Sequence, residues 1–256
     1  MAGSYEGGAG IDPMHQFEVH PIVELPALAG IDTSFTNSSL WMVLAVGLSG
    51  LFLLMASSRS ALVPGRLQLM GEMAYGFVAN MVKENVGTEG MKYFPFIFSL
   101  FMFILFCNML GMLPYSFTVT SHLIVTFALA ATVFLLITGV GFARHGIGFL
   151  KLFVPSGIPA ILLPLLVVIE VISYLTRPVS LSVRLFGNMM AGHTMLKIFG
   201  GFVVGLGSAG LVPLAIAPFA LMVAFTGLEL LIAGLQAYVF TILTCIYLNE
   251  AIHMDH

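Results

Sequence analysis

Apolar stretches of membrane-spanning length constrain the fold of this chain more than any other feature. The first, Leu40 to Ala56, is uncharged and close to the ~20 residues that a helix needs to cross a bilayer. Four more follow, at residues 93–113, 123–143, 161–200 and 211–248. They predict an all-α, polytopic membrane protein.

The charge content supports this class. Of 256 residues, 59% are hydrophobic and only 8% are charged, against roughly 25% in an average soluble domain. Nine Lys and Arg stand against twelve Asp and Glu, so there is no basic excess with which to bind nucleic acid. Cys107 and Cys245 both lie in apolar runs, which argues against a disulfide-stapled fold.

The distribution of the basic residues predicts the orientation. Residues 1–38 form an acidic tail without Lys or Arg, unlike a signal peptide, and the first transmembrane helix follows at 39–57. By the predicted topology, the basic residues after it fall on one side of the membrane, at positions 59, 66, 83, 92, 144 and 151. The positive-inside rule then places the tail outside and the C-terminus in the cytoplasm.

The middle of the chain predicts two further elements. Apolar side chains recur with a helical period over 67–86, which indicates an amphipathic interfacial helix. The two runs within 93–143 are joined by a short link, which predicts a transmembrane helical hairpin.

The C-terminal region, 160–250, leaves two alternatives open. Each of its long stretches would extend roughly 55 to 60 Å as a helix, about twice the ~30 Å hydrocarbon thickness. Each stretch therefore either breaks into two spans or forms one steeply tilted helix. No internal repeat accompanies them.

Charged and polar residues inside these two stretches are the candidate functional residues, because an intramembrane charge costs on the order of 3 kcal/mol. Glu170, Arg177 and Arg184 are seven residues apart and share one helix face with Ser173, which Asn188 continues. In the last stretch Glu229, Gln236 and Tyr247 share another face. A turn near 205–210 would bring residues 188–193, including His193, level with Glu229.

Several of these residues also have structural interpretations. Glu170 and Arg177 could form an ordinary ion pair, and His193 could donate a hydrogen bond to a carbonyl. Arg177 and Lys197 could extend to an interface, while Gln236 and Asn108 could bridge helices. Arg184 has no acid three or four residues away. Its position implies a carboxylate from elsewhere, such as another subunit.

Four segments resemble a known family, subunit a of F-type ATP synthases. PVSLSVRLFGNMMAG (178–192) resembles the family signature, and LQAYVFTILTCIYL (235–248) its C-terminal helix. NMLGMLP (108–114) and LFVPSGIP (152–159) are also similar. The resemblance implies a stator subunit with a nearly membrane-parallel hairpin, through which protons enter and leave a ring of c subunits.

The resemblance also implies roles for individual residues. Arg184 matches the essential arginine facing the ring, with Asn188 and Gln236 beside it. His193 and Glu229 match a polar pair on facing helices, in the arrangement opposite to that of some members. Glu170 and Ser173 match residues on the cytoplasmic side, with supporting polar roles left to Arg177, Asn108 and Tyr247.

The expected partners are the c-subunit ring, b-type peripheral-stalk subunits, the other subunits of the synthase and the lipid bilayer. No cofactor or metal is expected, and the chain is expected to be no enzyme by itself. A bacterial inner membrane is favoured over a mitochondrial one.

Two other classes remain as alternatives. A self-contained ion-coupled secondary transporter would be built from inverted repeats, which the sequence lacks. An intramembrane enzyme would need a Ser/His or paired-Asp arrangement on facing spans, and none is present in the predicted spans.

Overall fold

The computed structural model describes residues 17–23, 34–58, 64–113, 116–154 and 162–253. These residues form six α-helices: α1 (Asn37–Ser57), α2 (Arg66–Val86), α3 (Phe94–Gly111), α4 (Leu123–His145), α5 (Leu163–Ser208) and α6 (Val212–Ile252). Short 3-10 helices lie between them: η2 (Thr88–Lys92), η3 (Val119–Ser121) and η4 (Gly146–Phe153). A small antiparallel pair, β1 (Pro21–Val23) and β2 (Phe35–Thr36), precedes α1. The all-α prediction is confirmed.

Five helical segments of the described chain are long and apolar enough to cross a membrane. They are α1, α3, the continuous segment Leu123–Phe153, α5 and α6. Helix α2 is not among them, because polar and charged residues occupy one of its faces. The prediction of a polytopic membrane protein with an additional amphipathic helix is confirmed.

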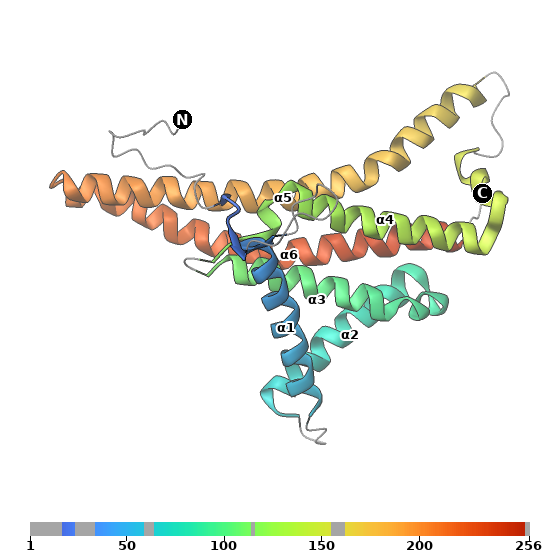
Figure 1. The fold of residues 1–256 in the computed structure, drawn as a ribbon, viewed down its shortest axis with the longest axis horizontal. Helices are drawn as coiled ribbons and strands as arrows, with labels where there is room; N and C mark the ends of the chain where they lie inside the picture. The colour runs from blue at the N-terminus through green and yellow to red at the C-terminus, as the bar shows by residue number, and fades with distance from the viewer. Residues whose placement is uncertain (1–16, 24–33, 59–63, 114–115, 155–161, 254–256) are drawn as a thin grey trace.

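Both long C-terminal stretches are continuous helices. Helix α5 has 46 residues and α6 has 41, with Pro178 and Pro218 inside them. The alternative of two spans in each stretch is therefore wrong. In Figure 1, α5 bends in its N-terminal half. This half contains Pro178, whose ring removes a backbone hydrogen bond. The turn between α5 and α6 includes Gly210, whose φ of 77° is a conformation that glycine adopts readily.

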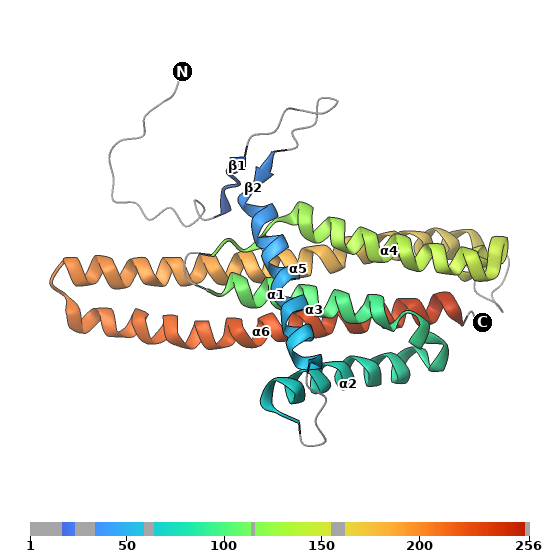
Figure 2. The ribbon, with the colours of Figure 1, turned by 60° about the horizontal axis from the view of Figure 1, so that its bottom comes forward.

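The long pair organises the fold. Helices α5 and α6 run antiparallel side by side, with α4 packed along α5 and α3 packed along α6 (Figure 2). Helices α3 and α4 are antiparallel, as the hairpin prediction requires, but each packs chiefly on the long pair. Helix α1 crosses the others steeply in both views (Figures 1 and 2) and contacts α2 and α3.

Apolar side chains fill the space between helices and also cover the outside. The core includes Ile104, Leu185 and Phe240, all 0% exposed. On the outside, Ile124 and Leu54 are 75% and 72% exposed. Such side chains are unfavourable in water but are compatible with lipid as solvent. Cys107 and Cys245 are both buried and unbonded, so they form no disulfide.

Candidate functional site

Arg184 lies on an exposed face of α5, next to an amide pair that joins the long helices. The Asn188 Nδ2 atom donates to Gln236 Oε1 over 2.8 Å, and Gln236 is only 4% exposed. Arg184 has no ion-pair or hydrogen-bond partner among the described residues. The described chain thus offers this guanidinium no carboxylate.

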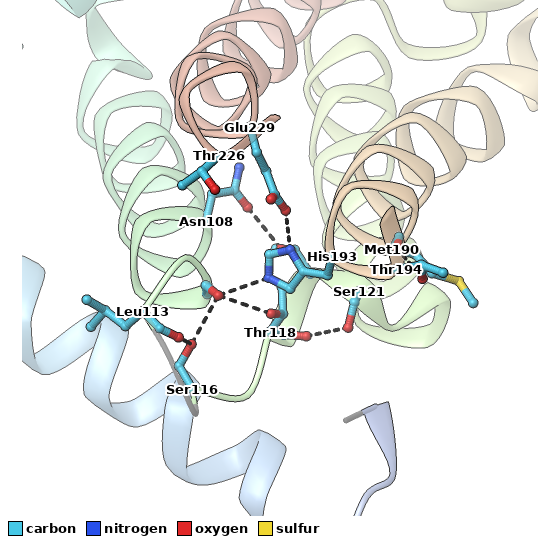
Figure 3. Close-up of polar contacts among 12 residues, drawn as sticks. Asn108, Leu113, Ser116, Thr118, Ser121, Met190, His193, Thr194, Thr226 and Glu229 are labelled. Atoms are coloured by element: carbon cyan, nitrogen blue, oxygen red, sulfur yellow. Dashed lines mark hydrogen bonds and ion pairs between the residues drawn. The ribbon is translucent and has the colours of Figure 1, made fainter. Parts of the chain in front are cut away.

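His193 on α5 and Glu229 on α6 form a buried pair (Figure 3). The imidazole Nδ1 contacts Glu229 Oε1, while Nε2 lies 2.9 Å from the carbonyl oxygen of Gly111 in α3. The two side chains are 11% and 5% exposed. The sequence-based inference that Glu229 lies level with the 188–193 segment is consistent with this geometry.

The carbonyl fixes the protonation pattern of this pair. A carbonyl oxygen only accepts hydrogen bonds, so His193 Nε2 carries a hydrogen and donates it to Gly111. The Nδ1 and Oε1 atoms then share one proton, held either as imidazolium with carboxylate or as neutral imidazole with carboxylic acid. Moving the proton between these two states needs no movement of either helix.

The absence of a side chain at Gly192 allows Glu229 to occupy this position. A Cβ atom at Gly192 would lie 2.7 Å from Glu229 Oε1 and 2.9 Å from its Cδ. Distances below 3.0 Å require something to move. Gly192 therefore makes room for a carboxylate between the helices.

The C-terminal part of α3 contacts both long helices near the pair. Asn108, 0% exposed, donates from Nδ2 to the Ala233 carbonyl of α6 over 3.2 Å and accepts from Thr120 Oγ1 over 2.9 Å. Gly111, one turn later, accepts from His193. The interpretation of Asn108 as a helix-bridging residue is confirmed. Sequence patterns did not identify the Gly111 carbonyl, because a backbone group leaves no signal in residue types.

The ion pair expected between Glu170 and Arg177, near the N-terminal end of α5, is not formed. Arg177 does not pair with Glu170; it pairs with Glu250 near the end of α6. Its guanidinium also lies over two rings, 5.2 Å from the Tyr174 centroid and 4.6 Å from that of Tyr247. Glu250 reaches Arg177 because the last turn of α6 lies beside this part of α5. Sequence reasoning missed Glu250, since it lies beyond the apolar run.

The residues expected on the cytoplasmic side are accessible. Glu170 is half-buried and Ser173 is exposed, and the described chain gives the Glu170 carboxylate no hydrogen-bond or ion-pair partner. Lys197, toward the opposite end of α5, is half-buried. Glu170 and Ser173 thus lie far along α5 from His193, and no contact in the described chain joins them to the His193–Glu229 pair.

The fold and site together define a polytopic helical membrane protein whose long helix pair carries a stripe of charged and amide groups with a buried histidine–carboxylate pair. The family model described as ATP synthase A chain matches residues 39–249. The ATP synthase subunit a of Parvibaculum lavamentivorans is 58% identical, over 98% of this chain and 96% of its own length. Those of Pelagibacter ubique and Rhodospirillum rubrum are 58% and 57% identical, over 96% and 94% of this chain and 99% and 98% of their own lengths.

This chain belongs to the ATP synthase A chain family. It is accordingly a membrane subunit of the ATP synthase complex and not an enzyme on its own.

Proposed function

We propose that this chain is the stator proton path of the synthase, which delivers protons to a ring of c-subunit carboxylates and receives them again after rotation. The observation that carries this proposal is the contrast between an exposed Arg184, unpaired in the described chain, and a buried His193–Glu229 pair whose imidazole and carboxylate are in direct contact. The first can attract a passing carboxylate, and the second can supply it with a proton.

Arg184 acts as a counter-ion and as a barrier. A guanidinium is a permanent cation in proteins and does not release its proton. It therefore attracts an ionised ring carboxylate but passes no proton from one side to the other. Two half-paths that end on either side of Arg184 remain separated, and direct leakage of protons is prevented.

The entry path runs past Glu229, His193, Asn188 and Gln236. Glu229 Oε2 is buried and has no hydrogen-bond partner in the described chain, so it is available to the next carrier, such as water. The proton shared with His193 is replenished from the outside and passed toward the amide pair. A ring carboxylate that accepts it becomes neutral and can move through lipid, where an ionised one is costly.

The exit path begins at Glu170 and Ser173. Both are accessible and lie at the end of α5 remote from the His193–Glu229 pair. After nearly a full turn the ring carboxylate releases its proton there. Each elementary charge that crosses gains ~2.3 kcal/mol per 100 mV, so several crossings together can drive the synthesis of one ATP.

The partner subunits and the membrane orientation follow from the proposed stator role. The c-subunit ring faces Arg184, b-type stalk subunits hold the stator, and the bilayer covers the exposed apolar side chains. The acidic N-terminus lies outside and the C-terminus in the cytoplasm, since basic residues concentrate on the cytoplasmic side by the predicted topology. The membrane is a bacterial inner membrane.

The pair is tested by Glu229→Gln in the complete complex reconstituted in liposomes. We expect slow proton-driven ATP synthesis and an altered dependence of its rate on external pH, because the shared proton is lost. An unaltered pH profile contradicts the relay. Proton transport by the chain alone, without a carboxylate ring, would instead support a self-contained transporter.

A further inference from the structure

We propose that Glu250 neutralises Arg177, so that Arg184 is the one uncompensated cation on the α5 face that carries Glu170, Arg177 and Arg184. This inference rests on the proposed function. It assigns to Glu250 the task of keeping a second arginine from capturing the ring carboxylates that Arg184 receives. Glu250 is a positioning and charge-compensating residue and contacts no transported proton.

The two arginines are close to equivalent by position. Seven residues separate them, which is two helical turns, about 10 Å along the axis and about 20° around it. A carboxylate that moves along this face toward Glu170 passes Arg184 and then the level of Arg177. Lys197 is not on this face, because its thirteen-residue separation from Arg184 places it about 220° around the helix.

The surroundings of the two arginines differ sharply. Arg177 pairs with Glu250 and is flanked by the rings of Tyr174 and Tyr247, with 17% of its side chain exposed. Arg184 is exposed and has no ion-pair partner among the described residues. Within the described chain, the fold therefore neutralises the guanidinium of Arg177 and leaves that of Arg184 without a counter-ion.

The position of Glu250 is not explained by the stability of its own helix. It lies in the last turn of α6, which ends at Ile252, and a carboxylate at a helix C-terminus interacts unfavourably with the helix dipole. Its side chain is 38% exposed, so it is partly hydrated and needs no partner for burial. What it does provide is a negative charge at the guanidinium of Arg177.

The consequence concerns release of the ring carboxylate on the exit side. Without Glu250, the Arg177 cation would attract an ionised carboxylate about two turns beyond Arg184, close to where protons leave the ring. At about 10 Å and an effective dielectric constant near 20, the attraction between the ring carboxylate and an uncompensated Arg177 is large enough to slow the departure of the carboxylate about tenfold.

The experiment compares three variants in the complete complex in liposomes: Glu250→Gln, Arg177→Gln and the double variant. Glutamine keeps the size of each side chain and removes its charge. We expect Glu250→Gln to lower proton-driven ATP synthesis about tenfold, by the charge argument above. Arg177→Gln should lose less, and the double variant should regain most of the lost rate, because the competing cation is gone.

A purely structural ion pair predicts another pattern. The yield of intact complex would then fall in the single variants and recover in the double variant, because an unpaired buried charge is what destabilises the fold. Synthesis per intact complex would stay near the wild-type rate in all three variants, and the inference would be overturned. Glu250→Asp, which keeps the charge, should retain synthesis, and the yield of intact complex checks folding for each variant. Arg184→Ala in the same assay separates this inference from the proposed function. Retained synthesis in Arg184→Ala refutes the proposed function. Lost synthesis in Arg184→Ala, together with a near wild-type rate per intact complex in Glu250→Gln, refutes only this inference.

Discussion

The sharpest structural prediction concerns Gly192, where a single methyl group should disrupt the proton-carrying pair. In Gly192→Ala the new Cβ would lie 2.7 Å from Glu229 Oε1, the oxygen that contacts His193. The carboxylate must move away from this position and gives up its one side-chain hydrogen bond in the described chain, the contact with His193. The helix itself tolerates alanine, so the effect falls on Glu229.

The magnitude follows from two opposing contributions. Breaking a buried charged pair costs about 3 kcal/mol, and alanine in place of glycine inside a helix returns about 1 kcal/mol. The net loss of about 2 kcal/mol applies to the free energy of unfolding. Within the folded protein the alanine gain does not act, so occupancy of the paired geometry falls by the full ~3 kcal/mol, on the order of 100-fold at 1.36 kcal/mol for each factor of ten. We expect a similar decrease in the rate of proton delivery.

Proton-driven ATP synthesis by the reconstituted complex measures this effect. Gly139→Ala in α4 is the matched control, since a Cβ there meets nothing within 4 Å. Adding Glu229→Asp to Gly192→Ala shortens the carboxylate side chain and should recover part of the rate. Synthesis by Gly192→Ala within twofold of the wild type would refute the reasoning.

Three further predictions concern folding and its pH dependence. Thr126→Val removes the hydroxyl that lies 3.1 Å from Ser182 Oγ between α4 and α5, and should destabilise the complex by about 1–2 kcal/mol in thermal unfolding, whereas unchanged unfolding would contradict it. The hydrogen bond from Arg144 holds the pKa of Glu89 below 4.5. The Glu89–Arg144 pair therefore stabilises the fold fully above pH 4.5, and this stabilisation is lost as pH falls through the lowered folded pKa. Glu89→Gln should remove this pH dependence of unfolding, and identical pH profiles for wild type and variant would refute it. Burial lowers the pKa of His122 below 6.5, so acidification below pH 6.5 should destabilise the wild type more than His122→Phe, and equal acid sensitivity would count against the desolvation argument.

The fold was largely predictable because lipid imposes strong constraints on sequence. Apolar runs of the required length identified the helices of the membrane region, and periodicity separated α2 from them. Hydropathy did not decide whether the last two stretches were whole or broken, since Pro178 and Pro218 are compatible with both. Continuity of each helix depends on packing against α3 and α4, which is not local information.

The candidate site was predictable where a residue type is costly in a membrane. Arg184, His193 and Glu229 were identified because each is costly inside a membrane. Arg184 and Glu229 also lie on helix faces that carry other polar residues, and the turn near 205–210 placed His193 level with Glu229. The carbonyl of Gly111 was not predictable, because backbone acceptors occur at every position. Glu250 was missed because its importance depends on which arginine it meets across two long helices.

The stator role is tested most directly by Arg184→Ala, measured in liposomes that contain the complete synthase under an imposed proton gradient. Two quantities are followed together: ATP synthesis and the passive decay of the gradient. The account predicts that synthesis is abolished in an intact, assembled complex, because no fixed cation then receives the ring carboxylate or separates the two half-paths. Synthesis near the wild-type rate would contradict the central assignment.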